Sequence, residues 1–214
     1  MRYLIVCGGK IDKEFGLNEI KTDGIDAIIA ADSGMDFLYE NGVTPDIIVG
    51  DFDSTKTNAL EYFERKGQTE IRRLNPIKDD TDTEYAIRLA ISEGARSIVV
   101  LGATGSRIDH VLGNISLLGI GLESGTDISI IDTNNRIRMA DKPVTIEKSA
   151  QYGRFVSLIA LTDDNEVSLK GFKYPVTDYS FDRFTSLGLS NEIVDDHALI
   201  DIHRGKFIII ESKD

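Results

Sequence analysis

Short runs of apolar residues alternate with longer helical patterns through residues 1–132, and this alternation restricts the possible folds more than any other feature. The runs are residues 3–7, 27–31, 47–49, 71–74, 98–101 and 128–131. They are nearly continuous in apolar residues, residues 71–74 least so, as strands covered on both faces require. Helical patterns lie between them, at residues 35–41, 58–66, 82–93 and 108–123. This order predicts an α/β fold in which the N-terminal domain is built on a doubly wound parallel sheet.

The rhythm changes after residue 132, where the helical spacing stops. Short strands are predicted at residues 144–146, 155–161, 167–169, 199–202 and 207–210. Turn-forming residues separate them, as in Asp163-Asp164-Asn165. This pattern is typical of an antiparallel β-sandwich. We therefore expect an α/β domain over residues 1–132 and a smaller C-terminal antiparallel β-sandwich domain over residues 133–214.

Composition excludes several classes of protein. The chain has 24 Lys+Arg and 36 Asp+Glu, a net charge of −12, which argues against binding to nucleic acid or to an anionic membrane. A single cysteine, Cys7, excludes an intrachain disulfide framework and a cysteine-based zinc site. The N-terminus does not resemble a signal peptide, and no apolar stretch approaches ~18 residues. We expect a cytoplasmic protein.

Acidic residues gather where the predicted strands end. Asp32, Asp51 and Asp53 directly follow two strands, and Asp79, Asp80 and Asp82 follow a third. In doubly wound sheets, ligands bind outside the carboxyl ends of the strands, so these loops are expected to share one rim. Such a group of carboxylates favours a divalent cation, and Mg²⁺ is the natural candidate. The alternative is that these residues only cap helices, and Thr81 with Glu84 fits a capping box.

A second signal is the segment of residues 102–110, which follows the strand at residues 98–101. Gly102 and Gly105 let backbone N–H groups approach an anion, and Arg107 can bind phosphate through its two-pronged guanidinium group. The segment is neither a P-loop nor a dinucleotide-binding motif. His110 follows Asp109 at the start of a predicted helix. We expect it either to contact the ligand or to hydrogen-bond to backbone groups at the end of the helix.

Together these motifs resemble the thiamine pyrophosphokinase family. The segments that carry the resemblance are residues 31–34 (ADSG), 50–54 (GDFDS), 78–82 (KDDTD), 102–110 (GATGSRIDH) and 186–192 (SLGLSNE). The resemblance spans most of the chain. It implies an N-terminal α/β domain that binds ATP and Mg²⁺, and a C-terminal β-sandwich that binds thiamine. It further implies a homodimer with thiamine between the subunits, and transfer of pyrophosphate from ATP to the thiamine hydroxyl, which yields thiamine diphosphate and AMP.

The resemblance also implies roles for individual residues. Asp51, Asp53 and Asp82 would hold Mg²⁺ on the phosphates, with Asp32 nearby. The nucleotide side would be lined by Gly102, Thr104, Gly105, Arg107, Asp109 and His110. Ser190 and Asn191 would contact the thiamine pyrimidine ring.

Three further assignments concern the chemistry of the transfer. Lys78 and Arg107 are the cations we assign to the developing phosphate charge. Asp79 or Asp80 is the candidate that orients the thiamine hydroxyl or accepts its proton. The chain has no Trp, so stacking on thiamine would use a Tyr or Phe: Tyr179, Phe181, Phe184 or a ring of a partner subunit.

Three alternatives remain from the sequence. The segment from Asp51 to Thr55 resembles the Asp-x-Asp nucleophile motif of haloacid-dehalogenase-like, Mg²⁺-dependent phosphatases, although two strands precede it here. A metal-dependent sugar-nucleotide transferase would also use an Asp-x-Asp pair. A regulatory binding module, with acids that only cap helices, would show no turnover.

Overall fold

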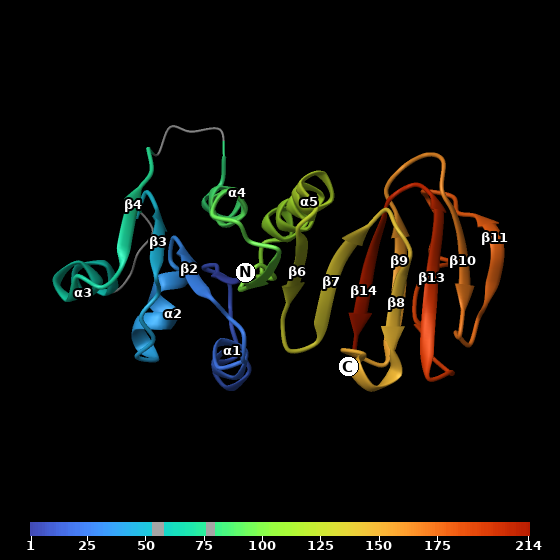
Figure 1. The fold of residues 1–214 in the computed structure, drawn as a ribbon, viewed down its shortest axis with the longest axis horizontal. Coiled ribbons are helices and arrows are strands. Elements are labelled where there is room, and N and C mark those ends of the chain that lie inside the picture. Colours follow the sequence, from blue (N-terminus) through green and yellow to red (C-terminus); the bar gives the residue numbers. More distant parts are fainter. Residues whose placement is uncertain (53–57, 76–79) are drawn as a thin grey trace. The chain divides into compact units, whose positions relative to one another are not determined.

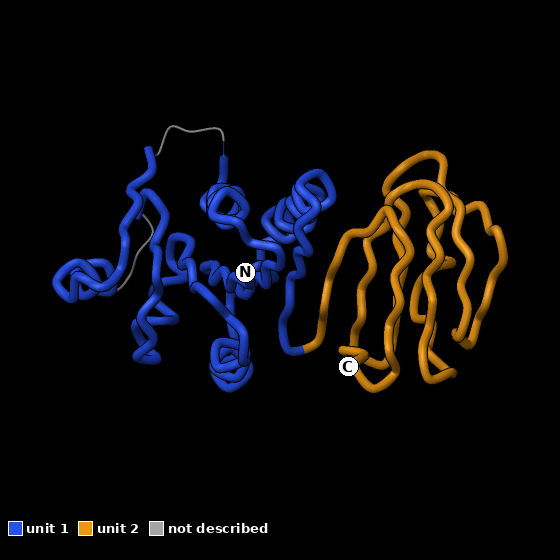
Figure 2. The backbone as a smooth tube through the Cα atoms, viewed as in Figure 1, with its two compact units in different colours: residues 1–133 blue, residues 134–214 orange. Residues whose placement is uncertain are grey.

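The computed structural model describes residues 1–52, 58–75 and 80–214. The chain divides into two compact units, Met1–Thr133 and Asn134–Asp214, which Figure 2 draws in blue and orange.

Unit 1 is built on a parallel sheet (Figure 1). Its strands are β1 (Arg2–Val6), β2 (Ala27–Ala31), β3 (Ile47–Gly50), β4 (Glu70–Arg73), β5 (Ser97–Leu101) and β6 (Asp127–Ile131). Their order is β6-β5-β1-β2-β3-β4, and every pairing among them is parallel. Nearly all residues of β1, β3 and β5 are buried, so the apolar runs of these strands are covered on both faces.

Helices cover both faces of this sheet. They are α1 (Lys13–Ile20), α2 (Gly34–Glu40), α3 (Ala59–Lys66), α4 (Asp82–Ser92) and α5 (Ile108–Ser124). In Figure 1, α4 and α5 lie above the sheet, and α1 and α2 lie below it. The chain therefore winds outward from β1 in one direction and from β5 in the other, and the predicted doubly wound sheet is confirmed. α1 was not among the predicted helices.

Local capping explains where two of these helices begin. Thr81 caps α4, and its hydroxyl accepts a hydrogen bond from Glu84 N at 3.2 Å, so this predicted cap is confirmed. Asp12 caps α1 in the same way through Phe15 N. Ser33 stands at the start of α2 without a side-chain capping bond. Capping thus accounts for Thr81 and does not account for Ser33.

Unit 2 contains two antiparallel sheets. One has the order β12-β9-β14-β7, and the other β11-β10-β13-β8. The bounds are β7 (Asn135–Ala140), β8 (Val144–Glu147), β9 (Phe155–Ala160), β10 (Glu166–Lys170), β11 (Val176–Ser180), β12 (Asn191–Glu192), β13 (His197–Arg204) and β14 (Phe207–Ser212). Apolar side chains of both sheets, among them Val156, Val167 and Phe207, form one buried core. The predicted β-sandwich is confirmed.

A buried carboxylate lies in the first of these sheets. Glu211 on β14 is fully buried and accepts hydrogen bonds from Arg136 Nη2 at 2.7 Å and Arg138 Nη2 at 2.9 Å, both on β7. Tyr152 N donates to the same carboxylate at 2.9 Å. These charge-assisted bonds offset the cost of burying the charge and link β7 to β14.

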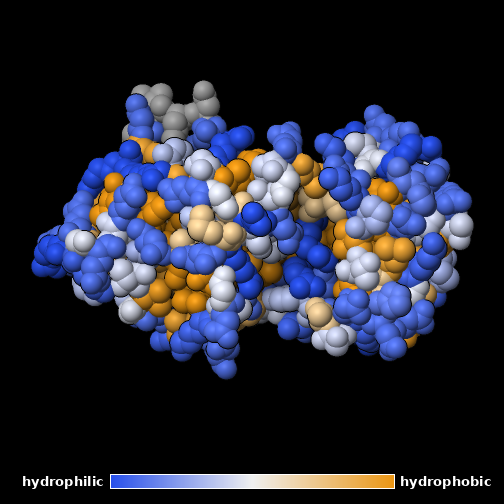
Figure 3. All heavy atoms as spheres, in the orientation of Figure 1, coloured by the Kyte–Doolittle hydropathy of each residue, from blue (hydrophilic) through white to orange (hydrophobic). Residues whose placement is uncertain are grey.

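Among the described residues, no helix combines the length and the apolar character needed to cross a bilayer. Figure 3 shows that hydrophilic side chains cover most of the drawn face, with hydrophobic ones between them.

Candidate active site

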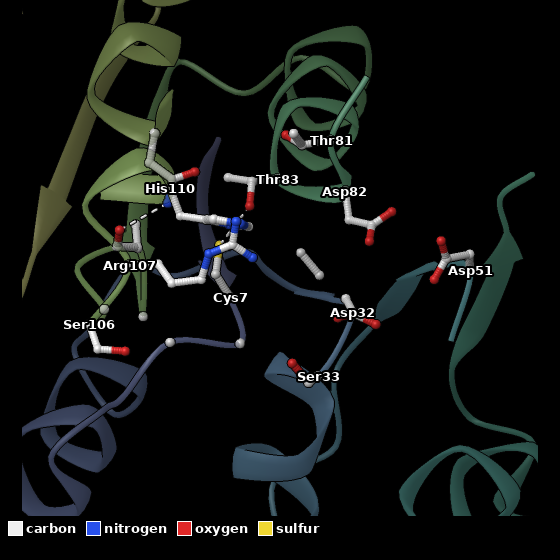
Figure 4. A pocket seen from close by; sticks show the side chains of 17 residues that line it. Cys7, Asp32, Ser33, Asp51, Thr81, Asp82, Thr83, Ser106, Arg107 and His110 are labelled. Carbon is white, nitrogen blue, oxygen red and sulfur yellow. Dashed lines mark hydrogen bonds between the residues drawn. The ribbon is translucent and has the colours of Figure 1, made fainter. Parts of the chain in front are cut away.

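A cavity of about 490 Å³ opens at the carboxyl end of the parallel sheet (Figure 4). It is lined by the residues that follow β1, β2, β3 and β5 and by the first turns of α4 and α5. These are Cys7, Gly8, Gly9, Ala31, Asp32, Ser33, Asp51, Thr81, Asp82, Thr83, Gly102, Ala103, Gly105, Ser106, Arg107, His110 and Asn114. β1 and β5 are the strands between which the winding reverses, and such switch points are where doubly wound sheets bind ligands.

Three carboxylates converge on one side of this cavity. Asp32, Asp51 and Asp82 each offer one oxygen, and these oxygens lie within 4.8 Å of one another. All three residues are half-buried. Figure 4 shows their side chains pointing toward a common space. The donors are carboxylate oxygens, so the cluster suits a hard divalent cation such as Mg²⁺, which would also relieve their mutual repulsion.

The backbone explains how acids from three elements meet. Asp32 follows β2 with φ of 48°, a left-handed conformation that is unusual for a residue other than glycine. Asp51 directly follows β3, and Asp82 is the first residue of α4. The rim predicted from the sequence thus brings Asp32, Asp51 and Asp82 together. Asp53, Lys78 and Asp79 lie outside the described residues, so their roles remain predictions.

The β5–α5 loop (residues 102–107) forms the opposite side of the cavity. Gly102 has φ of 69°, and a Cβ there would lie 2.4 Å from Cys7 O. Gly9 N donates to Gly102 O at 2.9 Å. Gly8 also lacks room, because a Cβ would lie 2.0 Å from Ser33 Oγ. The chain therefore needs glycine where the β1, β2 and β5 ends meet.

Sequence reasoning missed Gly8, Gly9 and Thr83, all of which line this cavity. A signal for the two glycines was present, since Gly8-Gly9 follows the first apolar run as Gly102 follows the fifth. Thr83 carries no comparable signal, because one threonine in the first turn of a helix is common without a ligand.

Arg107 and Asp109 form an ion pair at the start of α5. Arg107 Nη2 lies 2.6 Å from Asp109 Oδ2, and both side chains are about two-thirds exposed, at 69% and 65%. This hydrogen bond raises the pKa of Arg107 and lowers the pKa of Asp109, so both groups stay charged at neutral pH. Arg107 and His110 line the cavity, whereas Asp109 is not among the lining residues.

Cys7 directly follows β1 and is buried. Its Sγ lies 3.4 Å from Thr83 Oγ1. Burial raises the pKa of the thiol to about 11. The thiol is therefore protonated at neutral pH, and it is a poor nucleophile there.

We expect Cys7 to resist a thiol reagent such as dithionitrobenzoate at pH 8 in the folded protein, and to release one equivalent after denaturation. Because its pKa is higher in the folded state, the contribution of Cys7 to folding stability is full below about pH 9. That contribution is lost as the pH rises toward 11. Rapid modification of the native protein at pH 8 would contradict this.

In unit 2, Ser190 and Asn191 lie at the start of β12. Ser190 has φ of 58°, and its N–H donates to Ser157 Oγ at 3.0 Å. Asn191 is buried, and its amide contacts both backbone groups of Tyr174: Nδ2 donates to Tyr174 O at 2.9 Å, and Oδ1 accepts from Tyr174 N at 3.0 Å. The Asn191 amide thus fixes the chain at Tyr174, and a thiamine contact by either residue remains a prediction.

The aromatic candidates differ in accessibility. Phe181 is 4% exposed and belongs to the core between the two sheets, so the interpretation that it stacks on a ligand is wrong. Tyr179 packs edge-on against Phe181 and keeps 37% of its surface exposed, and Phe184 is 91% exposed.

The fold and the cavity together define an α/β phosphotransferase joined to a β-sandwich: the carboxylates, the glycine loop and Arg107 suit a polyphosphate at a topological switch point. Comparison with known proteins identifies the family. A model described as the catalytic domain of thiamin pyrophosphokinase matches residues 21–130, and one for its vitamin B1 binding domain matches residues 143–207. The chain belongs to the thiamine pyrophosphokinase family.

Individual relatives agree with this assignment. Thiamine pyrophosphokinase of Bacillus subtilis is 33% identical over 188 residues, which are 87% of each chain. The crystal structure of the thiamine pyrophosphokinase from Bacillus subtilis is similar over 100% of both chains, with a TM-score of 0.89 and 30% identity. That from Geobacillus thermodenitrificans is similar over 100% of this chain and 98% of its own, with a TM-score of 0.88 and 28% identity.

The activity expected from the sequence follows from this membership: the protein is a transferase that uses ATP to make thiamine diphosphate. Neither the phosphatase nor the sugar-nucleotide transferase alternative is favoured, because both family models and both structural neighbours are thiamine pyrophosphokinases.

Proposed function

We propose that the cavity of unit 1 is where this thiamine pyrophosphokinase binds ATP, and that Asp32, Asp51 and Asp82 hold Mg²⁺ there. The observation that carries the proposal is the convergence of three carboxylate oxygens within 4.8 Å, at the carboxyl end of the sheet. Three acids that only capped helices would have no reason to turn toward one point. When bound, Mg²⁺ would neutralise charge on the phosphate oxygens.

The chemical step is a displacement at the β-phosphorus of ATP. The thiamine hydroxyl oxygen forms a bond to that phosphorus, and the bond to the oxygen bridging the α and β phosphates breaks. AMP leaves with the bridging oxygen, and the hydroxyl proton passes to a carboxylate or to water. Asp79 or Asp80 remains the predicted carboxylate.

The residues of this chain then act mainly by position and charge. Arg107, which lines the cavity, places its guanidinium where charge develops on the transferred group. Its pair with Asp109 is exposed and weak, so a phosphate can replace the carboxylate at low cost. The backbone N–H groups of residues 102–107 and the N-terminus of α5 favour an anion at the same place. Lys78 and Asp53 are predicted to complete the site.

We also propose that the protein is a homodimer whose thiamine sites lie at the subunit interface, and that it works in the cytoplasm. Large apolar side chains that the monomer leaves exposed support the dimer. They include Ile108 and Leu112 on α5 and Tyr174, Leu187 and Leu189 in unit 2. Light scattering on the purified protein checks the dimer: a mass near 23.6 kDa would overturn it.

The activity is tested by incubating the protein with ATP, Mg²⁺ and thiamine and separating the nucleotide products. We expect AMP and thiamine diphosphate in equal amounts, AMP formation only when thiamine is present, and loss of both with excess EDTA. Formation of ADP or of free phosphate, or full activity in EDTA, would contradict the proposed chemistry.

A further inference from the structure

The β5–α5 loop is held by side chains that do not themselves belong to the sequence motif. Asn114, on α5, donates from Nδ2 to Ala103 O at 2.9 Å. Asp132, directly after β6, accepts from Thr104 Oγ1 through Oδ2 at 2.7 Å. Both contacts fall on neighbouring residues in the middle of the loop, between the Gly9–Gly102 backbone bond and Arg107.

The contact from Asn114 sets the direction of a backbone group. Ala103 is 3% exposed, and a buried carbonyl needs a hydrogen-bond donor, which Asn114 supplies. Because the peptide after Ala103 is planar and trans, a carbonyl directed at Asn114 leaves the Thr104 N–H pointing the opposite way. One side-chain hydrogen bond thus orients both polar groups of that peptide.

The contact from Asp132 explains why Thr104 is absent from the cavity lining. Gly102, Ala103, Gly105, Ser106 and Arg107 all line the cavity, whereas Thr104 does not. Its hydroxyl donates a hydrogen bond to Asp132, which directly follows β6. The side chain predicted to bind the nucleotide therefore contacts the protein instead, and it holds the loop by that contact.

We propose that Asn114 and Asp132 are positioning residues for the polyphosphate of the nucleotide: they fix residues 103 and 104 so that the loop presents its backbone N–H groups to the phosphates. This rests on the proposed binding of ATP in the cavity of unit 1. The two residues contact the loop from two different elements, Asn114 from α5 and Asp132 from the end of β6, so the peptide between Ala103 and Thr104 is held at its carbonyl and at the Thr104 side chain.

The test uses isosteric variants in the full-length protein. Asn114→Asp replaces the donor with an acceptor facing Ala103 O, and Thr104→Val removes the hydroxyl at constant shape. We expect each to raise KM for ATP about tenfold, the loss that one hydrogen bond of about 1.4 kcal/mol represents, with KM for thiamine within twofold of wild type. Thr104→Ser, which keeps the hydroxyl, is expected to recover most of the loss.

The control is Ser116→Ala on the same helix, which loses a hydrogen bond to Leu112 O and touches no part of the loop. It is expected to leave both KM values unchanged. A second readout is the rise in melting temperature that ATP causes, which Asn114→Asp and Thr104→Val should reduce.

Two outcomes separate this inference from the proposed function. If folded Asn114→Asp and Thr104→Val keep the wild-type KM for ATP and its thermal shift, the positioning role is wrong while ATP binding stands. If wild-type protein shows neither ATP-dependent turnover nor a thermal shift with ATP, the proposed function itself fails.

Discussion

Replacing Asp82 with asparagine is expected to lower kcat by about 10³-fold or more, with the fold retained. Asparagine keeps the shape of the side chain and removes one of the three charges that converge in the cavity. Electrostatic groups placed at a site of phosphoryl transfer commonly contribute ~10²–10³-fold each, and a lost metal ligand adds to that. Asp51→Asn is expected to act in the same direction, measured as steady-state formation of AMP.

The melting temperature of Asp82→Asn gives a second test of the carboxylate cluster. In the absence of a divalent cation, three neighbouring carboxylates repel one another, so removing one should leave the melting temperature unchanged or raise it. Addition of Mg²⁺ should stabilise wild type and have a smaller effect on Asp82→Asn.

The control for this prediction is Asp127→Asn. Asp127 is exposed at the start of β6, the end of that strand away from the cavity, and its loss should change neither kcat nor the response to Mg²⁺. If Asp82→Asn and Asp51→Asn keep near-normal kcat and the same requirement for Mg²⁺, the carboxylate cluster does not hold the cation.

Gly102→Ala is expected to have the largest effect on folding of any single methyl group added at the cavity. Two costs combine: the residue has φ of 69°, and the new Cβ would lie 2.4 Å from Cys7 O, a backbone atom that cannot turn aside. The left-handed conformation alone costs roughly 1–2 kcal/mol in a residue with a Cβ. With the displacement of β1 or β5 added, we expect a loss of about 3–4 kcal/mol.

Gly67→Ala measures the cost of the left-handed backbone conformation without a steric clash. Gly67 ends α3 with φ of 64°, and an added Cβ would have nothing within 4 Å. Its loss of stability should be only that of the left-handed conformation, about 1–2 kcal/mol. Urea unfolding of both variants measures the difference, and equal losses would show that the close approach of Gly102 to Cys7 does not limit the site.

The parallel sheet could be predicted because its strands, apart from β4, are short apolar runs, but α1 could not. Its sequence has few apolar residues, and Gly16 lies in its middle, where glycine disfavours a helix. Packing explains the exception: a Cβ at Gly16 would lie 2.7 Å from the ring of Phe37. A signal at its start was present, since Asp12 is a good helix cap.

In unit 2, β7 escaped prediction for a different reason. Arg136 and Arg138 interrupt its apolar pattern, and they are compatible with a sheet only because Glu211 lies opposite on β14. β11 is largely exposed, and β12 has two residues, so neither carries the alternation that identifies a strand.

In the candidate site too, some residues could be predicted from the local sequence pattern and others could not. Asp32, Asp51 and Asp82 could be predicted because each follows directly on a strand or begins a helix, and parallel strands bring such ends together. Thr104 was assigned to the nucleotide from its place in the motif, whereas its hydroxyl bonds to Asp132, 28 residues away. Contacts between distant segments leave no trace in local pattern, and Asn114 was missed for this reason.

The strand orders also bear on how the chain assembles during synthesis. In unit 1, β1 is made before β2 and β5 but lies between them, with Tyr3 paired to both Ala27 and Ile98. In unit 2, β14 emerges after all its neighbours and lies between β7 and β9. Pairings between such distant segments form slowly. We therefore expect β7 and β9 each to keep one edge unpaired on the ribosome until residues 207–212 emerge, so unit 2 depends on its last strand to complete this sheet.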